Sequence, residues 1–252
     1  NTNISGQIIL LNNQIEVSHT EYDSIFVALY PVSILNSDID NIIESYPDIG
    51  TEFSQQILFD HRNQNPVYCV KTDMDGLFRI NNVKKGIYNI VILKSNWSIK
   101  YLYNFEIIDN NKQNIGTIYL NKAISIKSDI TTQFLFKTGQ LYLVEDDTNF
   151  LNDVIVEEGT FIAVKPNKTI KFYNNISTPL TGWWHVNTDY NIFKIEKINI
   201  ISDNYYNGIV IYGDNINFLR SSIQNSNTAL SITSNNCSIS YCNFENNGYG
   251  II

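Results

Sequence analysis

The chain has 252 residues, a hydrophobic content of 43% and a formal net charge of −8 at pH 7. This length and composition allow one large domain or two modest ones, each with a real core. The negative charge argues against nucleic acid or an anionic membrane surface as the main partner. No apolar run approaches the ~18 residues of a membrane-spanning helix, and the many Tyr, Phe, Ile and Asn residues favour an all-β protein.

The sequence of residues 4–30 predicts two strands separated by an Asn-Asn turn. Segment 33–66 then interrupts the sheet pattern. Within it, Ser37 begins a capping-box sequence ahead of a short isoleucine stripe, which predicts a helix of two or three turns. The segment is acidic, with Asp38, Asp40, Glu44, Asp48 and Glu52. We interpret it as a solvated surface flap, and a functional insertion is the alternative.

Segment 67–93 contains strands separated by turns at Asp75-Gly76 and at Gly86. Over about residues 4–121 the chain resembles the carboxypeptidase regulatory-like family of prealbumin-type β-sandwiches. The resemblance rests on Thr72, Asp73, Asp75, Gly76, Phe78, Ile80, Val83, Gly86 and Tyr88. It implies a non-catalytic module of secreted, surface-anchored or outer-membrane proteins. The long insertion departs from the compact family pattern, so no binding role is carried over to it.

A strand at 116–120 is predicted to close this sandwich, which gives domains 1–124 and 125–252. From Gly139 onward, apolar strands alternate with turns such as Glu158-Gly159-Thr160. Together with the Trp-Trp-His stretch at 183–185, this pattern resembles the opening coils of pectin-lyase-like β-helix proteins. That architecture hosts lyases, hydrolases, adhesins and structural proteins, so the resemblance implies a fold and no activity. Four apolar residues are expected to lead into the regular coils: Phe193, Ile195, Ile198 and Ile200.

Residues 204–252 repeat at a fixed step. Gly208, Ala229 and Gly250 lie 229 − 208 = 21 and 250 − 229 = 21 residues apart, and each precedes an aliphatic residue. The same step aligns Ile216 with Cys237, Phe218 with Ile239, and Ile223 with Phe244. Such a repeat of short alternating apolar runs indicates a solenoid of coils whose parallel strands lie about 4.8 Å apart. We therefore predict an all-β protein with an N-terminal β-sandwich and a C-terminal right-handed parallel β-helix, an incomplete solenoid.

The chain ends and the cysteines add expectations about context. The chain begins at Asn1 without Met, as in a mature secreted protein or a trimmed sequence, and Ile252 falls inside a predicted strand. We expect further coils or a partner at that open end, self-association included. Cys69, Cys237 and Cys242 have no metal-site spacing, and we interpret Cys237 as a small buried hydrophobe.

The repeat also aligns Asn204, Asn225 and Asn246. We interpret this column as an internal asparagine ladder, in which each side-chain amide bonds to the next coil, because buried amides require partners. Trp183, Trp184 and the following Tyr190, near His185, form either a sugar-stacking platform or packing at the mouth of the first coils.

Carboxylates near coil bends are weak catalytic candidates. Asp203 and Glu245 are two coils apart, about 9.6 Å if they share a column, which is at the upper end of the ~5–9.5 Å range of glycosidase pairs. Asp189 and Asp214 lie near other bends. Asp73 and Asp75 are interpreted as turn residues and two acidic runs as solvated turns; calcium binding is the alternative at each, although no complete calcium loop is present. The acidic runs are Glu145-Asp146-Asp147 and Glu157-Glu158. No nucleophile motif, phosphate loop or zinc-ligand set appears, so we expect no metal or cofactor beyond that calcium.

These observations favour a secreted or cell-surface structural or adhesive protein, non-catalytic, whose rigid β-helix stalk assembles into a surface layer or filament. The alternative is a polysaccharide-binding or polysaccharide-cleaving β-helix enzyme, either a lyase or a glycoside hydrolase. The expected partners are a glycan and further copies of the chain.

Overall fold

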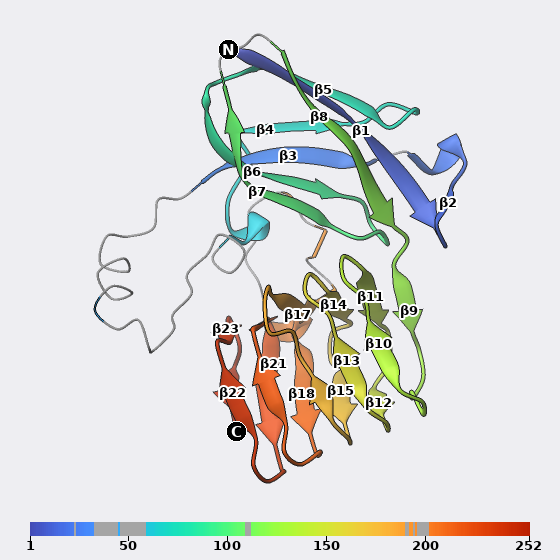
Figure 1. Cartoon of the computed structure of the whole chain (residues 1–252), viewed down its shortest axis with the longest axis vertical. Helices are drawn as coiled ribbons and strands as arrows, with labels where there is room; N and C mark the ends of the chain where they lie inside the picture. The colour runs from blue at the N-terminus through green and yellow to red at the C-terminus, as the bar shows by residue number, and fades with distance from the viewer. Residues whose placement is uncertain are drawn as a thin grey trace. The chain divides into compact units, whose positions relative to one another are not determined.

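The computed structural model describes residues 1–22, 24–32, 45, 59–108, 112–189, 192–193, 195 and 202–252. The chain is built from strands and divides into two compact units (Figure 1). The first unit comprises Asn1–Lys122 and Phe193–Ile198, and the second comprises Ala123–Ile192 and Asn199–Ile252. The predicted fold class, an all-β chain with an antiparallel sandwich followed by parallel coils, is confirmed.

The first unit holds two four-stranded sheets. One has the order β2-β1-β5, with β8 also paired to β1, and the other has the order β4-β3-β6-β7. The strands of the first sheet are β1 (Thr2–Asn12), β2 (Ile15–Glu16), β5 (Leu77–Val83) and β8 (Lys112–Asn121). Those of the second are β3 (Phe26–Pro31), β4 (Tyr68–Lys71), β6 (Gly86–Leu93) and β7 (Lys100–Ile107). β8 pairs with β1 in parallel, whereas the other pairs are antiparallel.

The main core of this unit lies between its two sheets and is formed by the side chains at alternate positions of their strands. Every second residue of β1 is buried, as strand geometry requires when one face is covered. The aliphatic centre of the core is Ile4, Ile8, Leu10, Val27, Leu29, Ile90 and Ile92. A short helix, η1 (His19–Tyr22), places Tyr22 against this core.

The predicted turn at Asp75-Gly76 is present and joins β4 in one sheet to β5 in the other. Gly76 has φ +70, and a Cβ there would lie 2.1 Å from the carbonyl oxygen of Ile8. Glycine is therefore required by both conformation and space. The Asp73 carboxylate stabilises the turn by accepting hydrogen bonds from the backbone N–H groups of Asp75 and Leu77, at 2.9 and 2.8 Å.

The predicted helix of the 33–66 insertion lies outside the described residues, as do Asp38, Asp40, Glu44, Asp48 and Glu52. Its described end forms a short helix, η3 (His61–Asn63), for which Asp60 is the N-cap.

The second unit contains three parallel sheets, and the chain visits them in turn (Figure 1). The first sheet contains β9 (Ile124–Ile126), β11 (Leu141–Val144), β14 (Phe161–Val164), β17 (Trp184–Thr188), β20 (Ser221–Gln224) and β23 (Asn243–Glu245). The second contains β12 (Thr148–Phe150), β15 (Thr169–Phe172), β18 (Tyr206–Ile211), β21 (Ser226–Ile232) and β24 (Tyr249–Ile251). The third contains β10 (Phe134–Phe136), β13 (Val154–Val156), β16 (Ile176–Ser177), β19 (Asn217–Leu219) and β22 (Ser238–Ser240).

Inward side chains of all three sheets form one core that runs through the coils. Its largest members are each at least 99% buried: Trp184, Tyr142, Tyr206, Phe136, Phe150, Phe172 and Phe218. The rings of Phe150 and Phe172, from successive coils, are stacked with centroids 5.1 Å apart. Stacking equivalent positions gives each coil an apolar neighbour that it could not supply alone.

Several of the predicted alignments within the last coils are confirmed, whereas that of Gly208 with Ala229 is wrong by one residue. Phe218 pairs with Ile239, and Ile223 pairs with Phe244. Ile209 pairs with Leu230, which in turn pairs with Ile251. Gly208 pairs with Thr228, so Ala229 is the extra residue of a β-bulge.

One coil is much longer than the repeat. Val186 pairs with Ile223, a step of 223 − 186 = 37, whereas Ile223 pairs with Phe244 at 244 − 223 = 21. The excess lies between β17 and β18 and includes a short helix, η4 (Ser202–Asn204). The expectation that Phe193 and Ile195 lead into the coils is wrong, because both pack on a sheet of the first unit. Ile198 and Ile200 lie outside the described residues.

Among the described residues, no helix has the length and apolar character needed to cross a bilayer.

Candidate functional site

A network of polar side chains in the second unit lies on the outward side of β17, β20 and β23. Val186, Ile223 and Phe244 form one inward column, so the residues on either side of each point outward. We call these outward residues the polar face: His185, Asn187, Ser222, Gln224, Asn243 and Glu245. Asn187 and Ser222 are buried despite their outward direction.

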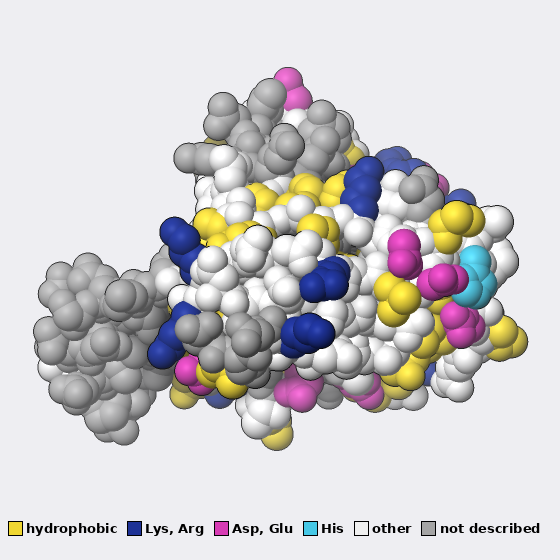
Figure 2. All heavy atoms as spheres, turned by 90° about the horizontal axis from the view of Figure 1, so that it is seen from above, with side chains coloured by type: hydrophobic (Ala, Val, Ile, Leu, Met, Phe, Trp, Pro, Cys, Tyr) yellow, Lys and Arg dark blue, Asp and Glu magenta, His cyan; other side chains and the backbone are white. Residues whose placement is uncertain are grey.

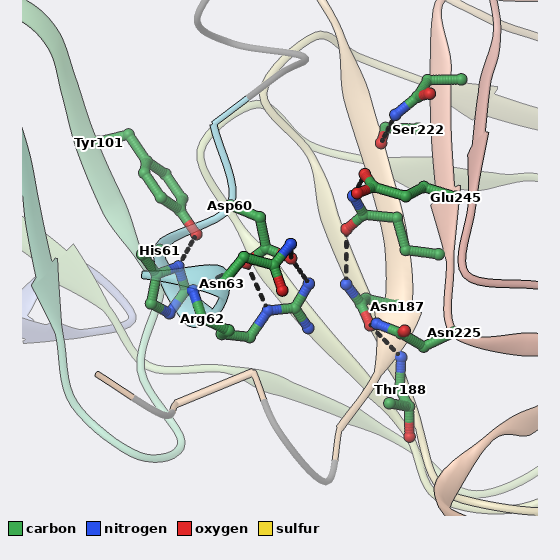
Figure 3. A network of polar contacts seen from close by, with 12 residues as sticks. Asp60, His61, Arg62, Asn63, Tyr101, Asn187, Thr188, Ser222, Asn225 and Glu245 are labelled. Carbon is green, nitrogen blue, oxygen red and sulfur yellow. Dashed lines mark hydrogen bonds and ion pairs between the residues drawn. The ribbon is translucent and has the colours of Figure 1, made fainter. Parts of the chain in front are cut away.

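Hydrogen bonds link the polar face from coil to coil. Asn187 Nδ2 donates to Gln224 Oε1 at 2.8 Å, and Gln224 Nε2 donates to Glu245 Oε2 at 2.8 Å. In the other direction, Asn225 Nδ2 donates to Asn187 Oδ1 at 2.8 Å. The backbone N–H of Thr188 donates to the same oxygen at 2.7 Å. Figure 3 shows this chain of dashed contacts running across the strands.

These bonds fix the register of three coils, because a slip would break the donor–acceptor pairing of buried amides. Asn243 Nδ2 also donates to Ser222 Oγ at 3.5 Å. Glu245 is the single carboxylate among the six residues of the polar face, and Gln224 supplies a hydrogen-bond donor to it. The arrangement suits a static polar scaffold better than a pair of opposed acids, which glycoside hydrolysis requires.

The predicted asparagine column divides in the structure. Asn225 is buried with φ +59, Asn246 is exposed with φ +55, and Asn204 lies in η4. The side-chain partner of Asn225 in the preceding coil is Asn187. The long coil explains this difference. Counting back 21 residues from Asn225 reaches Asn204, but β17, which pairs with β20, lies 37 residues back along the chain. The stabilising role of the column stays a prediction.

The two weak catalytic candidates lie on different elements. Asp203 is exposed in η4, which precedes β18 of the second parallel sheet, whereas Glu245 lies on β23 of the first. Glu245 shares its column with Gln224 and, one coil further, with Asn187. Asp203 is not in that column, so the geometric premise of the predicted carboxylate pair is absent. Their catalytic role remains untested.

The predicted aromatic platform is not displayed to solvent. Trp183 and Trp184 are both buried, with 6% and 0% of their surfaces exposed. Trp184 donates from Nε1 to the carbonyl oxygen of Leu219 at 3.0 Å and packs edge-on against Phe218. Tyr190 lies outside the described residues. Sugar binding by these residues stays a prediction without a described ring face to support it.

The acidic run that begins at Glu145 is engaged with protein donors. Glu145 accepts a hydrogen bond from Lys165 at 2.8 Å and one from Ser125, and Lys127 lies 3.4 Å away. These contacts, that of Lys165 foremost, lower the pKa of Glu145 from 4.5 to about 2. Burial raises the pKa of nearby Asp189, although Lys165 opposes this shift.

The remaining acidic residues considered for calcium also have local donors. Asp146 pairs with Lys168 at 3.2 Å, and the carboxylates of Asp147 and Glu157 accept backbone N–H bonds from the coil after or before them. Within the described parts of the chain, no three His, Cys, Asp or Glu side chains come together in a metal-binding group.

A second polar cluster lies in the first unit and was not predicted from the sequence. Arg62 forms two bonds to the Asp60 carboxylate, at 2.7 and 2.6 Å, and both side chains are at least 90% buried (Figure 3). Burial raises the pKa of Asp60, but the charge and hydrogen bonds of Arg62 outweigh it and hold the pKa below its ordinary value. His61 Nδ1 lies 3.0 Å from the hydroxyl of Tyr101, whose pKa is raised by burial. The only signal in the sequence was an Asp-His-Arg run at the end of an insertion.

Comparison with known proteins gives little further information. No family model matches the chain, and no curated protein matches it. Two similar solved structures are an N-terminal and a C-terminal interface mutant of the type II cohesin–X-dockerin complex from Acetivibrio cellulolyticus. They show 16% identity, with TM-scores of 0.31 and 0.27 over 49% and 48% of this chain. The matches span 59% and 57% of those chains. Likenesses of this size carry no argument about fold or function.

Proposed function

We propose that the chain is a non-catalytic structural module of a secreted or cell-surface protein, in which a carboxypeptidase regulatory-like sandwich accompanies a stiff right-handed β-helix. The observation that carries this proposal is the use of polar side chains for bonds between coils. Asn187, Gln224 and Glu245 bind one another along the stack, so their hydrogen-bonding groups are used within the scaffold.

The same use of polar groups recurs at other bends. Side chains one coil apart bond in pairs: Asp153 with Asn175, Asn207 with Asn227, Asn215 with Asn236, and Asn217 with Ser238. Each bond adds little on a wet surface, yet the rows oppose shearing of one coil against the next. Proteins of attachment structures and surface layers need stiff walls, and these rows of polar side chains would provide one.

The face visible in Figure 2 carries charged side chains of both signs. Basic and acidic side chains are scattered there among neutral and exposed hydrophobic ones. A concentrated basic field, which would steer nucleic acid or acidic polysaccharide, is not seen on that face.

Turnover assays on a panel of acidic and neutral polysaccharides test the proposal against the enzyme alternative. We expect the parent chain and the Glu245→Gln and Asp203→Asn variants to give the same background rate. Hydrolysis or β-elimination by the parent, lost in either variant, would replace the structural role with a catalytic one. A glycan array probed with the same three proteins separates binding from cleavage.

Self-association would turn the module into a layer or filament. β22, β23 and β24 each pair with one strand in the described structure, and Tyr249 and Ile251 are exposed beside them. Such edges accept further strands. Light scattering over a hundredfold range of concentration should show the average mass rising, and a constant monomer mass would remove assembly from the proposed role. Labelling of intact source cells tests the surface location.

A further inference from the structure

Two tyrosines occupy equivalent positions on successive coils of the second unit. Tyr173 directly follows β15, and Tyr212 directly follows β18. The residues before them, Phe172 and Ile211, are paired in parallel register. The backbone N–H of Tyr212 donates to the carbonyl oxygen of Phe172 at 2.8 Å, and that of Tyr173 donates in the same way to Phe150 at 3.0 Å. The register of the sheet therefore holds the two tyrosines one coil apart.

The two rings are in contact with each other and with solvent. The ring centroids of Tyr173 and Tyr212 lie 4.7 Å apart, and the ring planes are 20° from parallel. The two residues are 43% and 42% exposed. Both side chains point away from the coil core, because the neighbours Phe172 and Ile211 are core residues and successive side chains of a strand alternate. A reagent in solution can thus reach two phenol rings that the fold already holds together.

Other contacts between tyrosine rings in the described parts of the chain lack this combination. Tyr68 and Tyr88 meet edge-on, with centroids 6.2 Å apart. Tyr101 and Tyr103 are stacked at 5.5 Å, but both are partly buried, and the hydroxyl of Tyr101 contacts His61 in the polar cluster of the first unit. Stacking and exposure coincide at the pair in the coils.

Stacked and accessible phenols are suited to oxidative coupling. A one-electron oxidant takes one electron and the hydroxyl proton from each ring, which leaves two phenoxyl radicals. The radicals join through the carbons next to the phenol oxygens, so that one C–C bond forms between the rings. The two C–H bonds at those carbons then break, and their protons pass to the oxygens and restore both phenols. The net loss is two electrons and two protons, which reduce one hydrogen peroxide to two water molecules when a peroxidase is the catalyst.

We propose that Tyr173 and Tyr212 are a modification site at which a peroxidase and hydrogen peroxide form a dityrosine cross-link between two coils. Coupling requires two radicals to meet before either is lost, and a fold that holds both rings in place replaces a chance encounter with a local one. This inference does not depend on the proposed function.

The cross-link joins residues that are distant in the chain. The two tyrosines are 212 − 173 = 39 residues apart, and the segment between them contains the coil that is longer than the repeat. A covalent link of this kind restricts the unfolded chain, as a disulfide does. The linked protein should therefore unfold at a higher temperature than the unlinked one.

Treatment of the full chain with a haem peroxidase and hydrogen peroxide, at low protein concentration, tests the proposal. We expect a product of single-chain mass with dityrosine fluorescence. A digest should contain the peptides of Tyr173 and Tyr212 joined, lighter than their sum by two hydrogen atoms. This link should be about tenfold or more abundant than any other link between tyrosines. The melting temperature of the product should rise by several degrees.

Conservative variants separate coupling from packing. Tyr173→Phe and Tyr212→Phe keep a ring at each position but remove the hydroxyl that forms the radical, so each variant should abolish the link. Tyr119→Phe, at a ring of the first unit that is 55% exposed, should leave its yield unchanged. Absence of the link under conditions that couple free tyrosine would overturn the proposal. Equally abundant links among other tyrosines of the parent, or an unchanged melting temperature of the linked product, would also count against it.

Discussion

At the scale of single residues, positive φ angles locate where the coils bend. Asn225 and Asn246 occupy the same bend in successive coils and both have φ near +57, at 59 and 55. Asparagine tolerates this region better than other residues with a Cβ, because its short polar side chain bonds locally. The two positions differ in burial, which makes them a natural pair for separating backbone strain from the buried hydrogen bond.

We predict that Asn225→Ala lowers the free energy of unfolding by about 1–3 kcal/mol, because it removes the bond to Asn187 and leaves a buried acceptor without that donor. Asn246→Ala shares the backbone strain but has an exposed side chain, so its loss should be smaller. Chemical denaturation of the two variants and the parent measures the difference. Equal losses in both variants would assign the effect to the backbone alone.

Gly208 provides a second residue-scale prediction. It has φ +144, and a Cβ there would lie 2.0 Å from the carbonyl oxygen of Thr228 in the next coil. Gly208→Ala should therefore destabilise the protein by about 1–3 kcal/mol through overpacking and backbone strain. Gly250→Ala, where a Cβ meets nothing within 4 Å, is the control and should be close to neutral. Melting temperatures that fall equally would contradict the assigned geometry.

At the scale of elements, residues that follow the strands of the first parallel sheet form a ladder of alternating charge. Lys127, Glu145, Lys165 and Asp189 come directly after β9, β11, β14 and β17. The backbone N–H of each of the last three donates to the strand before it, at 2.8–2.9 Å, so the four positions are equivalent. Opposite charges thus alternate from coil to coil, and Glu145 pairs with the ammonium groups of Lys127 and Lys165 on the coils before and after it.

This ladder predicts a loss of stability in acid. The folded pKa of Glu145 is lowered from 4.5 to about 2. Its ionised form therefore contributes stability that is complete above about pH 4.5 and is lost as the pH falls towards 2. Asp189 has the opposite sign, because its raised pKa means that protonation favours the folded state.

Melting curves between pH 6 and pH 2 measure this contribution. Glu145→Gln should melt at a lower temperature than the parent at pH 6, and the two curves should converge near pH 2. A constant difference across the range would show that the carboxylate charge is not the cause. Asp146→Asn is a suitable control on the same turn, since Asp146 pairs only at the surface with Lys168.

At the scale of the whole chain, the two units are stabilised in different ways. The sandwich has one core enclosed between two sheets, whereas the coils share a continuous core to which each further coil adds its own inward side chains. In a stack of coils, loss of a core side chain weakens the neighbouring coils before it affects anything else.

We predict that Ile223→Ala, a fully buried position, costs about 2–5 kcal/mol and raises hydrogen exchange first in β17, β20 and β23. Exchange in β1 and β8 should stay at the parent level. Ile155→Ala, on the outward side of β13, should leave both regions unchanged. Uniform destabilisation of both units would show that they unfold together.

The sequence by itself determined the strand architecture, because period-two apolar patterning and a 21-residue step require side chains that alternate and coils that stack. It also determined the alignment of Ile209, Leu230 and Ile251, where each coil repeats the last without an insertion. Turn residues such as Gly76 were visible for the same local reason, since only backbone conformation was involved.

Only the tertiary structure decided which residues meet across the irregular coil. Asn187, rather than Asn204, bonds to Asn225, because an insertion changes the sequence distance while the paired strands keep their spatial register. Phe193 and Ile195 have the same apolar signal as residues of the coil core, yet they cover a sheet of the first unit, to which they belong. Hydrophobic burial is non-directional, so a pattern can show that a side chain will be buried but not against which surface.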